Sequence, residues 1–94
     1  MPYSPVEKKR VITRLRRIRG QADALERAVE AGTDCGALLQ QLAALRGATT
    51  GLMAELFESH LRETFGAEGQ IARPGPDAEG EIDQLMRIVR SYLK

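Results

Sequence analysis

The hydrophobic residues in the first third of the chain recur with the spacing of an amphipathic helix. They are separated alternately by four and three positions, at Val11, Leu15, Ile18, Ala22, Leu25 and Val29. This is a heptad-like stripe. Ser4 and Pro5 supply an N-cap and a first helical residue, Glu7 completes a capping box, and Gly32 is a typical stop. The pattern predicts a helix over about residues 5–31.

Two further helices are predicted downstream. Thr33 or Asp34 can cap a helix over about residues 34–65. Its apolar seam consists of Leu38, Leu42, Leu45, Leu52 and Leu56. Residues 66–76 are rich in Gly, Pro and Ala and are typical of a linker. A third helix over about residues 78–93 has an apolar face formed by Ile82, Leu85, Met86, Val89 and Leu93. No segment alternates as a strand does, so we expect an all-α fold with residues 1–94 as a single domain.

The short connection at Gly32 and Thr33 favours an antiparallel hairpin of the first two helices. A single hairpin of this size cannot bury apolar residues on two sides. We therefore expect two or more chains to assemble into four-helix bundles.

Few side chains in this sequence are reactive. The 94 residues include one cysteine, Cys35, and one histidine, His60. A single cysteine excludes an intrachain disulfide. No apolar run approaches the length of a membrane span, and no apolar signal-peptide core follows the basic N-terminus. We expect a cytoplasmic protein with a reduced thiol and no membrane partner. With no catalytic constellation or cofactor fingerprint in the sequence, we expect no enzyme and no required cofactor.

Cys35 lies where the second predicted helix begins, and a helix N-terminus favours the thiolate form of cysteine. His60 follows 25 residues later on the same helix, which corresponds to about 37 Å. The two side chains of one chain therefore cannot meet. If two copies of this helix cross antiparallel near the small residues Gly47 and Ala48, Cys35 of one chain approaches His60 of the other.

The hairpin also brings residues 2 and 3 towards residue 60 of the same chain. We expect removal of Met1 to expose the secondary amine of Pro2, which is partly unprotonated near neutral pH. The composite site would hold an amine, an imidazole and a thiol from the other chain. The alternatives at this point are that Cys35 is a small buried hydrophobe and that His60 is an ordinary surface or core residue.

Basic residues crowd the first predicted helix. Arg10, Arg14 and Arg17 share one flank of its apolar stripe, and Lys9 and Arg16 lie on a neighbouring flank. These charges lack the interleaved acids that form helical ion pairs, and arginine suits phosphate oxygens. A nucleic-acid partner is therefore favoured over the alternative, a solvated helix face.

Three stretches of the sequence resemble the copper-sensing and nickel/cobalt-sensing repressors, the CsoR/RcnR family. They are residues 10–21, residues 35–48 and the third helix down to Leu93. Similarity to the formaldehyde-responsive FrmR branch is carried by Met1-Pro2, Ser4-Pro5, Gly51-Leu52-Met53, His60-Leu61 and Ser91-Tyr92-Leu93-Lys94. The resemblance implies an all-helical dimer of dimers that represses transcription and leaves its operator DNA when an effector arrives. Residues Lys9, Arg10, Arg14 and Arg17 match the family's DNA-binding positions.

Members of the family differ at four site positions, which here are Tyr3, Cys35, His60 and Thr64. Copper sensors have a cysteine in place of Thr64, nickel and cobalt sensors have histidines in place of Tyr3 and Thr64, and persulfide sensors have a cysteine in place of His60. Cys35 and His60 alone under-supply a high-affinity transition-metal site.

The resemblance implies a formaldehyde sensor in which a methylene bridge joins Pro2 to Cys35 of another chain and His60 moves a proton. The bridge then releases the operator DNA of detoxification genes. One alternative is a metal-responsive repressor that uses Cys35 and His60, with weak transition-metal binding. Another is a helical oligomer without a role on DNA.

Overall fold

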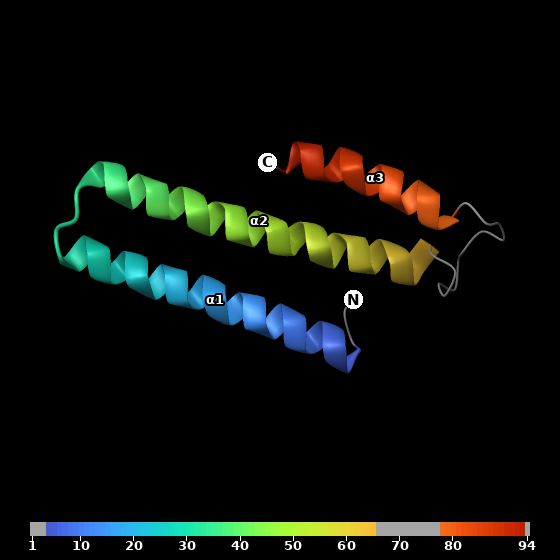
Figure 1. Ribbon diagram of the computed structural model, residues 1–94, viewed down its shortest axis with the longest axis horizontal. Coiled ribbons are helices and arrows are strands. Elements are labelled where there is room, and N and C mark those ends of the chain that lie inside the picture. The colour runs from blue at the N-terminus through green and yellow to red at the C-terminus, as the bar shows by residue number, and fades with distance from the viewer. Residues whose placement is uncertain (1–3, 66–77, 94) are drawn as a thin grey trace. The chain divides into compact units, whose positions relative to one another are not determined.

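The computed structural model describes residues 4–65 and 78–93 of the chain. These residues form three helices, α1 (Pro5–Glu30), α2 (Cys35–Phe65) and α3 (Ala78–Tyr92) (Figure 1). No strand occurs within these two ranges, and the predicted all-α class with three helices is confirmed. The observed helix ends lie within one residue of those that the sequence predicts. The predicted linker falls outside the described residues, and a single domain over the whole chain stays a prediction.

α1 begins at a capped proline. Ser4 is the N-cap, and its Oγ accepts a hydrogen bond of 3.2 Å from the backbone N–H of Glu7. Pro5 follows at the first helical position, where its missing N–H costs no hydrogen bond. The backbone oxygen of Ser4 accepts the next bond, from Lys8, at 2.9 Å. The N-terminus of the basic helix is therefore fixed locally by its own sequence.

The turn between α1 and α2 depends on one glycine. Gly32 has a φ of 76°, in the left-handed region that favours glycine. This conformation lets the N–H of Thr33 donate back to the oxygen of Ala28 at 3.0 Å, closing the end of α1. The chain then reverses direction directly before α2.

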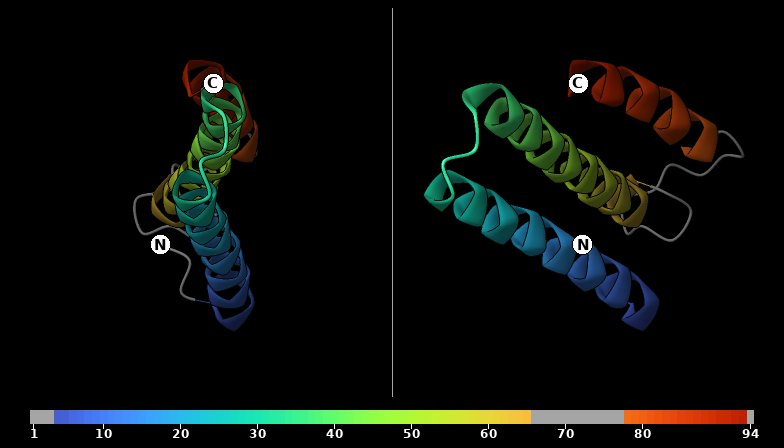
Figure 2. Two further views of the ribbon diagram at one scale, coloured as in Figure 1. Left: turned by 90° about the vertical axis from the view of Figure 1, so that its left-hand side faces the viewer. Right: turned by 60° about the vertical axis from the view of Figure 1, so that its left-hand side comes forward.

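The chain divides into two compact units, and α2 contributes to both. The first unit is Ser4–Leu52. In it, α1 and the first part of α2 run antiparallel, side by side (Figures 1 and 2). No residue of α1 is buried, and its apolar stripe is only half covered by α2. On α2, Leu39 is 60% exposed and Leu42 is 47% exposed. One hairpin therefore leaves apolar surface open.

The second unit contains the end of α2 and α3. Its hydrophobic core joins Ala54 and Leu61 of α2 to Ile82 and Met86 of α3. Val89 and Leu93 pack against this cluster. Leu85, which we expected on the same apolar face, is 41% exposed. It precedes Met86 by one position, and consecutive residues of a helix point about 100° apart, so both cannot face α2.

Candidate functional site

Cys35 is the first residue of α2, and its thiol is exposed. The residue before it caps the helix, because Oδ2 of Asp34 accepts a hydrogen bond of 3.0 Å from the N–H of Ala37. From the sequence alone, either Thr33 or Asp34 could have been the N-cap of α2. The cap fixes the backbone next to the thiol, and exposure leaves the sulfur within reach of a small electrophile.

His60 and Thr64 lie one helical turn apart near the other end of α2. The histidine is exposed and the threonine is half-buried. α2 continues through the 25 positions from Cys35 to His60 without a break, a rise of about 37 Å. Cys35 belongs to the first unit and His60 to the second, and that the two cannot meet within one chain stays a prediction from the rise of the helix. Pro2 and Tyr3 lie outside the described residues.

In residues 4–65 and 78–93, no three side chains of the types His, Cys, Asp and Glu gather in a way that could hold a metal ion. In the same part of the chain, no helix has the length and apolarity to span a membrane. Both findings concern one chain alone. A composite site at the meeting of two chains would draw its ligands from both.

The basic residues of α1 differ in their burial. Four of the five that the sequence singles out are exposed: Lys9, Arg10, Arg16 and Arg17. Arg14 is half-buried. One terminal nitrogen of its guanidinium, Nη2, lies close to Gly51 of α2, 3.1 Å from the position that a Cβ there would occupy. The five residues are therefore not equivalent, a difference that helical spacing alone did not predict.

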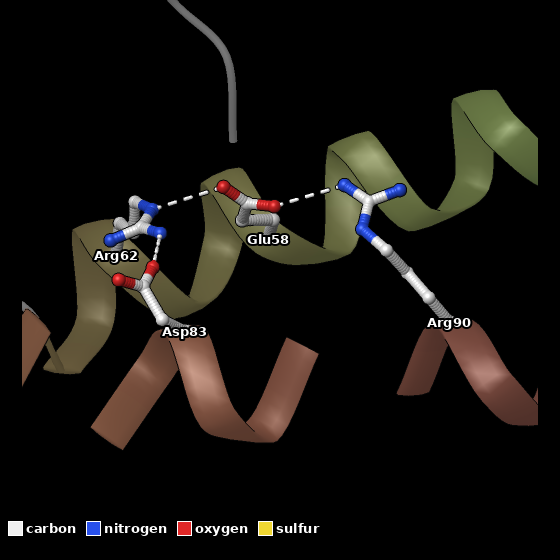
Figure 3. Close-up of polar contacts among 4 residues, drawn as sticks. All are labelled: Glu58, Arg62, Asp83 and Arg90. Carbon is white, nitrogen blue, oxygen red and sulfur yellow. Dashed lines mark hydrogen bonds and ion pairs between the residues drawn. The ribbon is translucent and has the colours of Figure 1, made fainter. Parts of the chain in front are cut away.

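An ion-pair network links α2 to α3 in the second unit (Figure 3). Glu58 accepts hydrogen bonds from Nε of Arg62 at 3.2 Å and from Nη2 of Arg90 at 3.0 Å. Arg62 also pairs with Asp83 of α3. Along these three pairs the four side chains alternate in charge. This network joins α3 to the stretch of α2 that carries His60.

The network was not predicted from the sequence. Glu58 and Arg62 are separated by four positions, which is the spacing of a helical ion pair. This spacing could have predicted the pair within α2. Their partners Asp83 and Arg90 lie on another helix, so no periodic pattern assigns them.

Comparisons with known proteins identify the family. The family model for the metal-sensitive transcriptional repressors matches residues 7–91. The transcriptional repressor RcnR of Salmonella arizonae is 35% identical over the full length of both chains. An "uncharacterized protein in bioA 5'region" of Serratia marcescens is 47% identical, also over the full length of both.

A solved structure is similar as well. It is a variant of the formaldehyde-responsive regulator FrmR from Salmonella enterica serovar Typhimurium, with 47% sequence identity and a TM-score of 0.68. The match covers 97% of this chain and 99% of that one. The family consists of transcriptional repressors and not of enzymes. The chain belongs to the CsoR/RcnR family of transcriptional repressors, in its FrmR branch.

Proposed function

We propose that this repressor senses formaldehyde at Cys35. The observation that carries the proposal is the exposure of this thiol at the start of α2. The 47% identity to a formaldehyde-responsive regulator supports the same effector. Cys35 and His60 are the only strong metal ligands at the four site positions of the family, two short of a tetrahedral set.

The proposed chemistry needs a thiol and an amine. The sulfur of Cys35 adds to the carbonyl carbon of formaldehyde, and the oxygen takes up a proton to give an S-hydroxymethyl group. The amine of Pro2, exposed by removal of Met1, then displaces this hydroxyl as water and gives up its own proton. The product is an N–CH2–S bridge, and the protein gains one carbon atom. The partner's His60 would pass the thiol proton to the formaldehyde oxygen and would later pass the amine proton to the departing hydroxyl, which leaves as water.

The bridge is proposed to join two chains, in a dimer of dimers. Exposed apolar residues on both helices of the first unit support assembly, Ile12 and Leu15 on α1 and Leu39 and Leu42 on α2. An antiparallel crossing of two copies of α2 brings Cys35 to His60 of the partner subunit. Gly47 and Ala48 lie midway and allow a close helix crossing.

The operator is proposed to bind the exposed basic residues of α1, Lys9, Arg10, Arg16 and Arg17. Arginine and lysine side chains of this kind contact phosphate oxygens. Closing the bridge would draw one chain terminus against a helix of the other chain and move the basic residues out of register with DNA. A repressor of this kind acts on the chromosome in the reducing cytoplasm, where Cys35 stays a free thiol.

The experiment combines a mobility shift with the intact mass of the protein. With DNA from upstream of its own gene, the wild-type chain should bind, and formaldehyde should release it as two chains become joined with one added carbon atom for each bridge. Cys35→Ala and Pro2→Ser should bind DNA normally but neither gain the carbon nor leave the DNA. If either variant still responded to formaldehyde as the wild type does, the bridge would be wrong.

A metal-responsive repressor is the second candidate, favoured by the family's metal sensitivity and by RcnR as a relative. Cys35 and His60 of the partner subunit would be its protein ligands, with water completing a weak transition-metal site. Here nickel, cobalt, zinc or copper alone should release the operator without a change in covalent mass. That outcome would favour this candidate over formaldehyde sensing.

A further inference from the structure

His60 belongs to a face of α2 on which two large apolar side chains are open to solvent. Met53 is 52% exposed and Phe57 is 41% exposed, and His60 is exposed as well. The three follow one another at intervals of four and three positions, the spacing that places side chains on one face of a helix. Phe57 is therefore a direct neighbour of His60 on the helix surface, with about 5–6 Å between their Cβ atoms.

The face of α2 that packs on α3 is a different one. Ala54 and Leu61 lie in the hydrophobic core that α2 shares with α3. Each comes directly after a residue of the open face, and consecutive residues of a helix point about 100° apart. Within the second unit, α3 thus covers the core residues and leaves Phe57 and His60 open to solvent. Packing on α3 gives no reason for an aromatic side chain beside the histidine.

Cys35 has a similar apolar neighbour near the start of α2. Leu39 lies one helical turn after the exposed thiol and is 60% exposed itself. In the proposed antiparallel crossing, Cys35 faces His60 of the partner subunit, so the residues after Cys35 lie opposite the residues before that histidine. Leu39 would then meet Phe57 of the partner subunit next to the reactive groups. A second copy of this chain is the occupant that suits both apolar neighbours.

We propose that Phe57 sets the lifetime of the methylene bridge, because its ring keeps water away from the bridging carbon. The inference rests on the proposed formaldehyde bridge between Pro2 and Cys35. Phe57 moves no proton and acts only by excluding solvent. Formation of the bridge releases one water molecule and its hydrolysis consumes one, so the access of water to this carbon governs how fast the bridge is lost.

Hydrolysis shows where water has to enter. The C–S bond breaks with its electron pair on sulfur, which leaves a thiolate on Cys35 and an iminium on Pro2. Water then adds to the iminium carbon and gives one proton to the thiolate. The resulting N-hydroxymethyl group returns its hydroxyl proton to nitrogen and leaves as formaldehyde. An aromatic ring beside the iminium carbon limits the attack by water, whereas a polar side chain there would hold water in place.

The test measures the lifetime of the bridge after formaldehyde is removed. Each protein is bridged with formaldehyde, dialysed against fresh buffer, and sampled over time for its mass after denaturation. Phe57→Gln should lose the added carbon about tenfold faster than the wild type, which corresponds to a barrier lower by about 1.4 kcal/mol. Phe57→Leu, which keeps the position apolar, should stay close to the wild type.

Phe65→Gln is the matched control. Phe65 also lies on α2 and is 48% exposed, but it follows His60 by five positions and points to another side of the helix. Its bridge should last as long as that of the wild type. Operator affinity without formaldehyde and the mass of the oligomer should be unchanged in every variant, which separates water exclusion from a general structural effect. If Phe57→Gln does not assemble, Phe57→Ala carries the comparison, with Phe65→Ala as its control.

Three results would overturn the inference while leaving the bridge itself intact. They are a wild-type lifetime in Phe57→Gln, an equal loss of lifetime in Phe65→Gln, and a lifetime in Phe57→Leu as short as that in Phe57→Gln. A wild-type chain that gains no carbon from formaldehyde would instead contradict the proposed function, and this inference with it.

Discussion

At the scale of single residues, backbone chemistry decides where the two long helices end and begin. Gly32 adopts a positive φ that few other residues tolerate. Two positions later, the carboxylate of Asp34 accepts a hydrogen bond from the backbone N–H of Ala37, in the first turn of α2. These two residues set the position of Cys35, the thiol that follows directly in sequence. Local stability at the turn and the placement of the reactive group are therefore linked.

Replacing Gly32 by alanine should destabilise the fold by about 1 kcal/mol, because the added Cβ is strained at positive φ. Gly20 is a matched control, since it lies inside α1 and a Cβ there would contact nothing within 4 Å. Gly20→Ala should stabilise by about 0.5–1 kcal/mol. Urea unfolding at one fixed protein concentration measures both changes. Equal effects of the two substitutions would be evidence against a special backbone at Gly32.

Asp34→Ala should cost about 1 kcal/mol, because the N–H of Ala37 loses its side-chain acceptor. Asp34→Asn should retain most of that stability, since an asparagine oxygen caps a helix equally well. Thermal unfolding of the three proteins at the same concentration gives the comparison. Unfolding of Asp34→Ala at the wild-type temperature would mean that Asp34 does not cap α2 in solution.

At the scale of elements, α3 is held on α2 by two kinds of contact. Met86 is 4% exposed and lies in the hydrophobic core of the second unit. The ion-pair network also joins α2 to α3, and its side chains are between 29% and 56% exposed to solvent. Partly solvated ion pairs contribute little, while a buried apolar side chain contributes much. Packing should therefore dominate the docking of α3.

Met86→Ala should destabilise the protein by about 2–5 kcal/mol, through reduced burial and the cavity left behind. Asp83→Asn should cost less than about 1 kcal/mol, because Asp83 is mostly exposed and water screens its pair with Arg62. Urea unfolding in low and high salt distinguishes the two contributions, since only the ion-pair contribution weakens with salt. A larger loss from Asp83→Asn than from Met86→Ala would reverse this ranking.

The three helices could be predicted from sequence because their signals are local. Ser4, Gly32 and Asp34 act on neighbours within one turn, and the heptad-like stripe is periodic over the whole of α1. The contacts of α3 could not be predicted, because Asp83 and Arg90 find their partners about 20 to 30 residues away in the chain. The partial burial of Arg14 was missed for the same reason, since its guanidinium lies beside Gly51 of another helix. For the candidate site, the structure shows that Cys35 is exposed. The approach of this thiol to Pro2 of another chain stays a prediction.

At the scale of the whole molecule, assembly of several chains should cover the apolar residues that a single chain leaves exposed. The apolar residues of α1 and α2 form stripes that a single hairpin covers only in part. A helix that presents apolar residues on two sides is stable when further helices pack on it. The composite site proposed for formaldehyde depends on the same assembly, since Cys35 and His60 are far apart on one helix.

Leu42→Glu should dissociate the oligomer, because it introduces a charge into the apolar stripe of α2. Gln41→Glu is the matched control, since it adds the same charge at an exposed polar position next to it. Sedimentation should give a smaller mass for Leu42→Glu and the wild-type mass for Gln41→Glu. The smaller species should also lose operator affinity, because it presents fewer basic residues to the DNA. An unchanged mass for Leu42→Glu would place the interface elsewhere.

The covalent state of the protein after formaldehyde treatment tests the central claim most directly. The protein is treated, denatured and weighed, so that only covalent links between chains persist. We expect a covalent dimer that carries one added carbon atom for each bridge and that is absent in Cys35→Ala. Chains that remain single after denaturation, or a dimer that forms equally in Cys35→Ala, would contradict the proposed bridge.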